Sequence, residues 1–172
     1  MTGSAEPDSA KAGSDSPGDI PAERPASLDR LDTLIGRWET EASFEAGFFG
    51  PGSSPITARG RTTFEWLAGR FFLTQRFVNE HPAMPSGIAI IGAGADPESF
   101  EQNYYDSRGV ARVYAMSLNG DVLKIWREAP GFWQRYNGAI SSDGNTITGA
   151  WEASADGRDW RHDFNLIYTK VN

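Results

Sequence analysis

The pattern of apolar and polar residues divides the chain into two parts. Residues 1–26 are mainly Ala, Ser, Gly, Pro and charged residues, without an aromatic side chain. Such a segment buries too little apolar surface to offset the entropy lost on ordering. We therefore predict a disordered tail over residues 1–26, with solubility or partner binding as its possible roles, and one folded domain over residues 27–172.

A short helix is predicted at the start of this domain. Leu28, Leu31 and Leu34 recur at helical spacing, with Ile35 on the same face. Ser27 precedes them as an acceptable N-cap. Because nine residues form a marginal helix on their own, we expect this segment to pack across one end of the domain.

From Arg37 onward apolar and polar residues alternate, with a turn signal about every 12 residues. Asn119-Gly120, Asp143-Gly144 and Asp156-Gly157 are the strongest two-residue hairpin signals. The pattern predicts an all-β fold of about ten strands in an up-and-down meander. An even number of strands lets the last one pair with the first, so we predict a closed antiparallel β-barrel without free edges.

Register at each turn decides which side chains face the interior. Pairing across Asp143-Gly144 places Trp151 opposite Tyr136. Pairing across Asp156-Gly157 places His162 opposite Trp151 and turns Asp163 outward. The predicted inner face of the last three strands consists of Tyr136, Ile140, Ile147, Trp151, Trp160, His162, Phe164, Leu166, Tyr168 and Lys170.

The predicted barrel has one plugged end and one open end. The tight turns at Gly69, Gly120 and Gly144 return to the end that holds Trp38. The longer connections, near residues 47–55, 80–86, 106–109 and 128–131, lie at the opposite end. A barrel with a plugged bottom and a looped mouth suits ligand binding.

The inferred interior is mostly aromatic with a few polar groups, the usual composition of a small-molecule site. Arg112 and Arg127 have inward parity near the mouth, and a buried guanidinium needs a partner. A ligand carboxylate or phosphate would bind both in a bidentate manner. Alternatively, both arginines reach into water or pair with Asp106 or Glu128. The predicted ligand-binding residues are Phe44, Gln75, Tyr104, Arg112, Arg127, Gln134, Tyr136, Trp151, Trp160 and His162.

Histidine chemistry is restricted to two residues. His162, with inward parity, is a candidate general base, ligand hydrogen-bonder or haem ligand, or else a core histidine bonded to Gln134 or Tyr136. Tyr104 is the other candidate catalytic residue. His81 precedes Pro82 in a mouth loop, where we expect it to be solvated. No Ser-His-Asp triad, phosphate-binding glycine loop or interior pair of carboxylates is apparent.

Composition narrows the partners and cofactors. The net charge of −7 disfavours nucleic acid and anionic membranes as partners. The chain has no cysteine, which disfavours a zinc site and suits a reducing compartment. It shows no apolar run of roughly 18 residues and no secretory pattern, so we expect a cytoplasmic protein. We expect no metal and no cofactor, with haem as the alternative.

Gly36-Arg37-Trp38 resembles the Gly-x-Trp signature of the calycins, the lipocalins and their relatives. In such barrels the tryptophan plugs the closed end, and a basic residue from the last strand lies across it. Lys170 occupies the matching place in this chain, and a cation over an indole face is a favourable pairing. The resemblance implies that Trp38 and Lys170 form the structural plug.

Longer segments resemble a bacterial family of uncharacterised calycin-like domains, whose role is not established. A more distant resemblance is to the nitrobindins, which bind haem through a histidine near the C-terminus, where His162 lies. Fatty-acid-binding proteins, also calycins, hold carboxylates with interior Arg and Tyr residues. The segments that carry the family resemblance are Thr63-Phe64-Glu65-Trp66-Leu67, residues 86–92, residues 105–114, residues 148–152 and His162-Asp163-Phe164.

Three functions remain open from the sequence. The first is a carrier or sensor of a small apolar or aromatic, acidic ligand. The second is a cofactor-free enzyme, such as a cyclase or isomerase of a hydrophobic metabolite. The third is haem binding through His162. We also predict a homodimer through Trp126, Trp133 and Val113, where Trp126 and Trp133 oppose each other if their loop has four residues.

Overall fold

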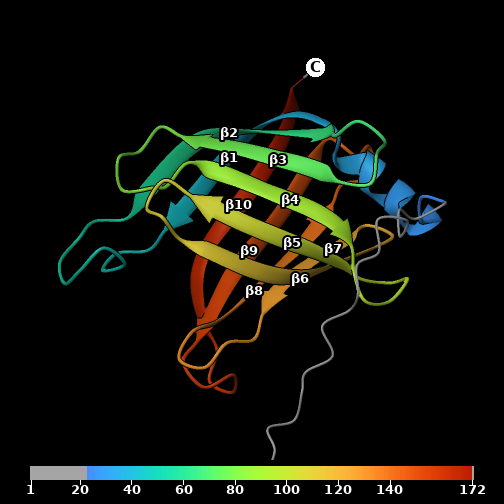
Figure 1. Cartoon of the computed structure of the whole chain (residues 1–172). Coiled ribbons are helices and arrows are strands. Elements are labelled where there is room, and N and C mark those ends of the chain that lie inside the picture. The colour runs from blue at the N-terminus through green and yellow to red at the C-terminus, as the bar shows by residue number, and fades with distance from the viewer. Residues whose placement is uncertain (1–22, 172) are drawn as a thin grey trace, which may run out of the picture.

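Ten antiparallel strands close into one barrel, each paired with its neighbours along the chain (Figure 1). The structure, a computed structural model, describes residues 23–171, so most of the tail predicted over residues 1–26 lies outside the described residues. Pairing of the last strand with the first completes the ring, which confirms the predicted up-and-down barrel. The strands are β1 (Gly36–Phe44), β2 (Ile56–Trp66), β3 (Leu73–Asn79), β4 (Gly87–Ala93), β5 (Phe100–Asp106), β6 (Ala111–Asn119), β7 (Val122–Arg127), β8 (Trp133–Ile140), β9 (Thr146–Ser154) and β10 (Arg161–Val171).

The predicted short helix is present as the 3₁₀ helix η1 (Ala26–Leu34). Leu28, Leu31 and Leu34 are its buried residues, and their spacing of three matches the three residues per turn of a 3₁₀ helix. Pro25 occupies the N-cap without a side-chain hydrogen bond, so the predicted cap at Ser27 is wrong. In Figure 1 this helix, in blue, lies at one end of the barrel.

Trp38 lies at that end between η1 and the last strand. Its side chain is 1% exposed, and its indole N–H donates to the carbonyl of Leu34 at 2.8 Å. The Nζ atom of Lys170 lies 4.9 Å from the ring centroid and donates to the carbonyl of Thr33 at 3.3 Å. These contacts close the barrel below its aromatic interior.

Most of the predicted register is confirmed. Trp151 pairs with Tyr136 across β8 and β9, and Met116 pairs with Ile125 across β6 and β7. The outer face differs in one respect, because Trp126 pairs with Arg135 rather than with Trp133. The last pair before this connection is Arg127 with Gln134, so residues 128–133 separate the paired positions, two more than the four residues that the prediction required.

The last hairpin departs from the prediction at a β-bulge between His162 and Phe164. The predicted two-residue turn is a longer loop, in which the Asp156 carboxylate accepts hydrogen bonds from the backbone of Arg158 and Asp159. His162 therefore pairs with Glu152, and Phe164 pairs with Trp151. A one-residue shift exchanges the two faces of a strand, so His162 faces outward. Phe164, Leu166, Tyr168 and Lys170 keep their predicted inward parity.

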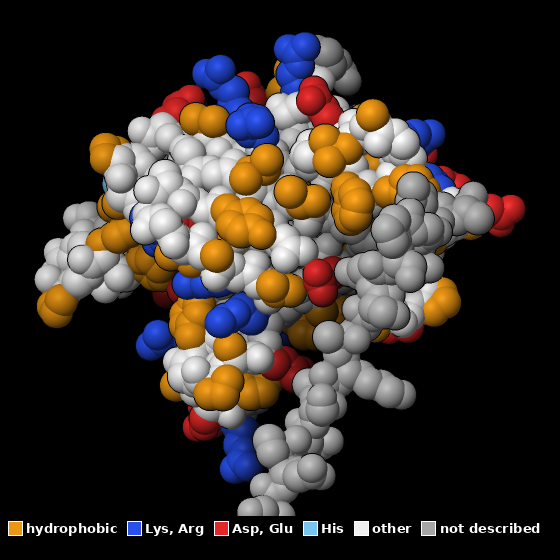
Figure 2. Space-filling view, viewed as in Figure 1, with side chains coloured by type: hydrophobic (Ala, Val, Ile, Leu, Met, Phe, Trp, Pro, Cys, Tyr) orange, Lys and Arg blue, Asp and Glu red, His pale blue; other side chains and the backbone are white. Residues whose placement is uncertain are grey.

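Five of the nine connections between strands, the two longest among them, lie at the end of the barrel away from Trp38. They comprise residues 45–55, 80–86, 107–110, 128–132 and 155–160, between the strand ends. None of the helices in residues 23–171 has the length and apolar character needed to cross a membrane. Figure 2 shows apolar side chains scattered over the face turned to the viewer. The exposed large apolar residues on strands include Val78, Tyr105 and Val113.

Candidate functional site

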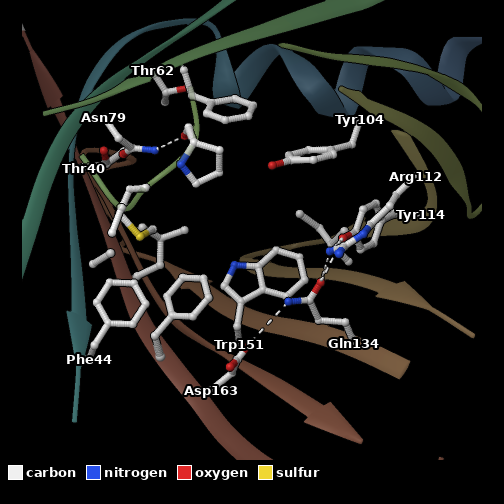
Figure 3. A pocket seen from close by; sticks show the side chains of 18 of the residues that line it. Thr40, Phe44, Thr62, Asn79, Tyr104, Arg112, Tyr114, Gln134, Trp151 and Asp163 are labelled. Atoms are coloured by element: carbon white, nitrogen blue, oxygen red, sulfur yellow. Dashed lines mark hydrogen bonds between the residues drawn. The ribbon is translucent and has the colours of Figure 1, made fainter. Parts of the chain in front are cut away.

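A cavity of about 410 Å³ opens at the loop-bearing end of the barrel. Its volume falls within the range of roughly 300–1,000 Å³ typical of small-molecule sites. Aromatic and aliphatic side chains form most of the wall, and a few polar groups interrupt it (Figure 3). The polar lining residues are Thr40, Thr62, Gln75, Asn79, Gln102, Tyr104, Arg108, Arg112, Tyr114, Gln134, Asp163 and Tyr168.

Phe44 is the centre of an aromatic wall on one side of the cavity. Its ring centroid lies 4.7 Å from that of Phe48 and 5.2 Å from that of Phe49, both in the β1–β2 loop. Phe164 of β10 stands 4.9 Å from Phe44 and 6.4 Å from Trp151. In Figure 3, Trp151 stands between this wall and the polar residues opposite it.

Four polar residues from three strands form a cluster on the opposite side. The hydroxyl of Tyr114 donates to Oε1 of Gln134 at 2.9 Å. Nη1 of Arg112 lies 3.4 Å from the same oxygen and 3.3 Å from the Tyr114 hydroxyl oxygen. The other end of the Gln134 amide donates through Nε2 to the Asp163 carboxylate at 3.3 Å.

The charge of Arg112 has no adjacent countercharge within residues 23–171. None of the ion pairs of this part of the chain, all defined within 4 Å, includes Arg112. Its guanidinium carbon lies 4.8 Å from the ring centroid of Phe132, and its side chain is half-buried. The guanidinium therefore faces the cavity with only long hydrogen bonds to neutral groups.

Tyr104 also lines the cavity, but its hydroxyl bonds to Asp106 and not to the Arg112 cluster. Its hydroxyl donates to Asp106 at 2.8 Å, and Arg108 donates to the same carboxylate at 2.6 Å. Burial, and after it the hydrogen bond to Asp106, raises the pKa of Tyr104 far above its usual value. The phenol is therefore a neutral donor whose proton is already in use, which argues against a role as a base.

A second polar chain runs deeper in the barrel. The Thr62 hydroxyl donates to the carbonyl of Arg76 at 3.0 Å and accepts from Nε2 of Gln75 at 3.5 Å. Oε1 of Gln75 in turn accepts from Nε2 of Gln102 at 3.3 Å. Oε1 of Gln102 is buried without a hydrogen-bond partner among the described residues. Nearby, burial raises the pKa of Tyr168 to about 12.

The structure separates the predicted binding residues into two groups. Phe44, Gln75, Tyr104, Arg112, Gln134 and Trp151 line the cavity. Tyr136 lies in the core behind Trp151, and its hydroxyl donates to the carbonyl of Leu166 at 3.3 Å. Arg127 donates to the carbonyl of Phe132 at 3.1 Å and is absent from the lining, because its strand ends at the rim.

Trp160 and His162 lie outside the cavity, contrary to the predicted parity. Trp160 precedes β10, and the guanidinium carbon of Arg135 lies 4.0 Å from the centroid of its ring. The ring of His162 is exposed and hydrogen bonds to Asn165 at 3.1 Å. The bulge between His162 and Phe164 causes this reversal, so this histidine does not fit the role of an interior base or haem ligand.

His81, the other histidine, lies in the mouth loop after β3. Its ring stacks on Phe49 with 6.2 Å between centroids, and Nδ1 accepts from the backbone N–H of Ala83 at 3.2 Å. It does not line the cavity. Within residues 23–171, no three His, Cys, Asp or Glu side chains converge as a metal site.

Two residues of the polar cluster were not among the predicted binding residues. Tyr114 has the same parity as Arg112, two residues earlier on the same strand, and this shared parity was the available signal. Asp163 was predicted to face outward, because alternation alone contains no sign of the bulge. The aromatic side chains of Phe48, Phe49 and Phe132 come from loops, where period-two reasoning gives no orientation.

Fold and site together define a closed ten-stranded antiparallel barrel with an aromatic cavity at its mouth. No family model matches the chain, and no curated protein matches its sequence. Among solved structures, the chain is similar to the crystal structure of Rv2717c from M. tuberculosis, with a TM-score of 0.62 and 15% sequence identity. The match covers 87% of this chain and 100% of that one, and at this identity it shows the fold alone.

Proposed function

We propose that this protein is a small-molecule carrier or sensor of the calycin type, which holds an aromatic, acidic ligand in the mouth cavity. The proposal rests chiefly on Arg112. Its half-buried guanidinium has no carboxylate within 4 Å among the described residues, and it stands in a cavity of suitable size for a small molecule. A ligand carboxylate would supply the missing countercharge through charge-assisted hydrogen bonds.

The surroundings of Arg112 favour a planar, apolar ligand body. Trp151, Phe164 and Phe44 form a continuous aromatic surface opposite the polar cluster. Aromatic rings prefer offset or edge-to-face contacts with one another. A ligand with a ring between these walls would place its acidic group beside Arg112 and Tyr114.

Binding can be tested with an aromatic carboxylate such as 2-naphthoic acid and with its neutral amide. Trp151 should report binding by a change in fluorescence emission, because it lines the cavity. Arg112→Leu should weaken the acid about tenfold or more, equivalent to about 1.4 kcal/mol. The same change should leave the amide nearly unaffected.

Arg76→Leu is the matched control, since Arg76 is an exposed arginine of β3 that does not line the cavity. It should leave the affinities for both probes close to those of the wild-type protein. Equal loss of acid and amide in Arg112→Leu would show that the arginine only shapes the barrel. Failure of both probes to bind wild-type protein would count against the carrier function itself.

A cofactor-free enzyme is the second candidate, and the position of Asp163 favours it. A carboxylate that faces an aromatic cavity beside an arginine and a phenol is arranged for proton abstraction next to a carbonyl group. Asp163 would take the proton, while the Arg112 guanidinium would stabilise the enolate oxygen. Exchange of solvent deuterium into a ketone with an aromatic ring, such as phenylacetone, would support this function if Asp163→Asn abolishes it.

A further inference from the structure

Asp163 belongs to the candidate site because of an irregularity in β10. The bulge between His162 and Phe164 interrupts the pairing with β9. Without it, strict alternation would turn Asp163 to the outer face whenever Phe164 faces inward. β-Bulges commonly re-aim a side chain next to a functional site, and here the re-aimed side chain is a carboxylate in an aromatic cavity.

The carboxylate is held by a neutral group rather than by a cation. Its hydrogen-bond partner is Nε2 of Gln134 at 3.3 Å. Within residues 23–171, no ion pair includes Asp163. A carboxylate accepts several hydrogen bonds when ionised, so Asp163 keeps acceptor capacity toward the cavity.

Gln134 joins Asp163 to Arg112 and orients both. This side chain is only 8% exposed, and the Tyr114 hydroxyl donates to its Oε1, which fixes the direction of the amide. Oε1 therefore faces Arg112, and Nε2 faces Asp163. Figure 3 shows Gln134 between the two charged groups, with Trp151 beside it.

The guanidinium and the carboxylate are thus separated by one amide group and two hydrogen bonds. A molecule with an acidic group and a hydrogen-bond donor on neighbouring atoms spans a similar separation. An acid without such a donor would bring its charge close to Asp163 without satisfying that carboxylate. A hydroxy acid or an amino acid satisfies Arg112 and Asp163 together.

We propose that the cavity selects aromatic acids that carry a hydroxyl or ammonium group on the carbon next to the carboxylate. The Asp163 carboxylate accepts a hydrogen bond from this group. The inference rests on the proposed function for the acidic group, which binds at Arg112. The donor subsite, the place beside Asp163 for the hydroxyl or ammonium group, is inferred from a separate contact, that between Asp163 and Gln134. It can therefore be tested on its own with neutral probes.

The first test uses indole-3-lactate and indole-3-propionate, which differ by the hydroxyl beside the carboxylate. Calorimetry should show that wild-type protein binds the lactate at least about tenfold more tightly. In Asp163→Ala the two affinities should move in opposite directions: the lactate weakens and the propionate strengthens, because a nearby negative charge is removed. Asp163→Asn keeps the size of the side chain. Its preference for the lactate over the propionate should lie between that of wild-type protein and that of Asp163→Ala.

Glu128→Gln is the matched control, because Glu128 is an exposed carboxylate of a mouth loop outside the cavity lining. It should preserve the preference for the lactate. Equal affinity of wild-type protein for lactate and propionate would overturn the proposal. A parallel change of both affinities in Asp163→Ala would overturn it as well, since the residue would then only shape the cavity.

The second test uses the neutral pair tryptophol and 3-ethylindole, which needs no acid at Arg112. Tryptophol should bind more tightly to wild-type protein, and Asp163→Ala should abolish that preference, while Arg112→Leu should retain it. If the neutral pair behaves in this way but no aromatic acid binds, the acid-carrier function is refuted and the donor subsite is supported. Absence of an Asp163-dependent preference in both pairs, including absence of binding, would refute the donor subsite.

Discussion

The ammonium of Lys170 lies 4.9 Å from the centre of the Trp38 ring, and the two residues pair directly across β10 and β1. The barrel is therefore closed at the point where its first strand meets its last. The same tryptophan donates to η1 through the carbonyl of Leu34. The N-terminal helix, the first strand and the last strand therefore meet at one side chain.

Trp38→Ala should destabilise the protein by about 3–5 kcal/mol, the usual cost of truncating a buried tryptophan. Glu39→Ala, on the neighbouring outward position, should change the stability by less than about 0.5 kcal/mol. Urea denaturation of both variants provides the measurement. Similar losses in the two variants would show that the plug contributes no more than a surface side chain.

Gly36 has a physical reason to precede this tryptophan. Its φ of +123° lies in a region that side chains rarely adopt, and an added Cβ would stand 3.3 Å from Cε of Lys170. Gly36→Ala should therefore cost about 1–3 kcal/mol. Gly50→Ala is the control, since Gly50 has nearly the same φ of +124° but no atom near an added Cβ. A smaller loss at Gly50 would show that the contact with Lys170 adds to the backbone strain at Gly36.

Alternation and turn chemistry were sufficient to predict the barrel, its closed end and most of its inner face. They failed in the last hairpin, where Asp-Gly indicated a two-residue turn. There the Asp156 side chain binds successive backbone N–H groups of a longer loop, a use of aspartate that the dipeptide does not reveal. The bulge that follows this loop turns His162 outward and Asp163 inward, the reverse of the prediction.

The candidate site was predictable in composition but not in its contacts. Parity placed Tyr104 and Arg112 inside, and both line the cavity. Parity could not show that the Tyr104 proton is committed to Asp106, which leaves Tyr114 as the phenol beside Arg112. Side-chain orientation at strand ends depends on the turns, and period-two patterns carry no information there.

The barrel should fold without residues 1–26. Deletion of residues 1–22 should leave the melting temperature unchanged. Deletion through residue 26 also removes Arg24, whose guanidinium carbon lies 4.9 Å from the centroid of the Trp66 ring and which pairs with Asp29. A loss of about 1–2 kcal/mol is expected from this ion pair and stacking contact, because the Arg24 side chain is only 19% exposed. Thermal unfolding of the two truncated proteins distinguishes these contributions.

Trp126 and Val113 remain our proposed dimer surface. Trp126 pairs with Ala115, two residues from Val113 on β6, and Val113 is 53% exposed. Trp133 lies diagonally from Trp126 across β7 and β8 rather than opposite it. Light scattering should show a dimer that dissociates in Trp126→Arg and persists in Phe72→Arg, an exposed site in the β2–β3 turn. A wild-type monomer at high concentration would remove this proposal.

Asp106 should make the stability of the mouth depend on pH. Burial alone would raise the pKa of its carboxyl, but hydrogen bonds from Arg108, Tyr104 and the backbone outweigh burial and hold the pKa far below its usual value. A pKa that is lower in the folded protein stabilises the fold above the unfolded pKa of about 3.9. That stabilisation declines as the pH falls from there toward the folded pKa.

Asp106→Asn should therefore lose roughly 1.5–3 kcal/mol at pH 7, the usual contribution of hydrogen bonds to a charged group. The difference from wild-type protein should narrow below about pH 4, because the unfolded wild-type chain then takes up a proton that its folded state resists. Urea denaturation at pH 7, 5 and 3 measures this trend, with Asp121→Asn in the exposed β6–β7 turn as the control. A difference that stays constant with pH would mean that the substitution acts through packing, and that the Arg108 and Tyr104 contacts do not stabilise the ionised carboxylate.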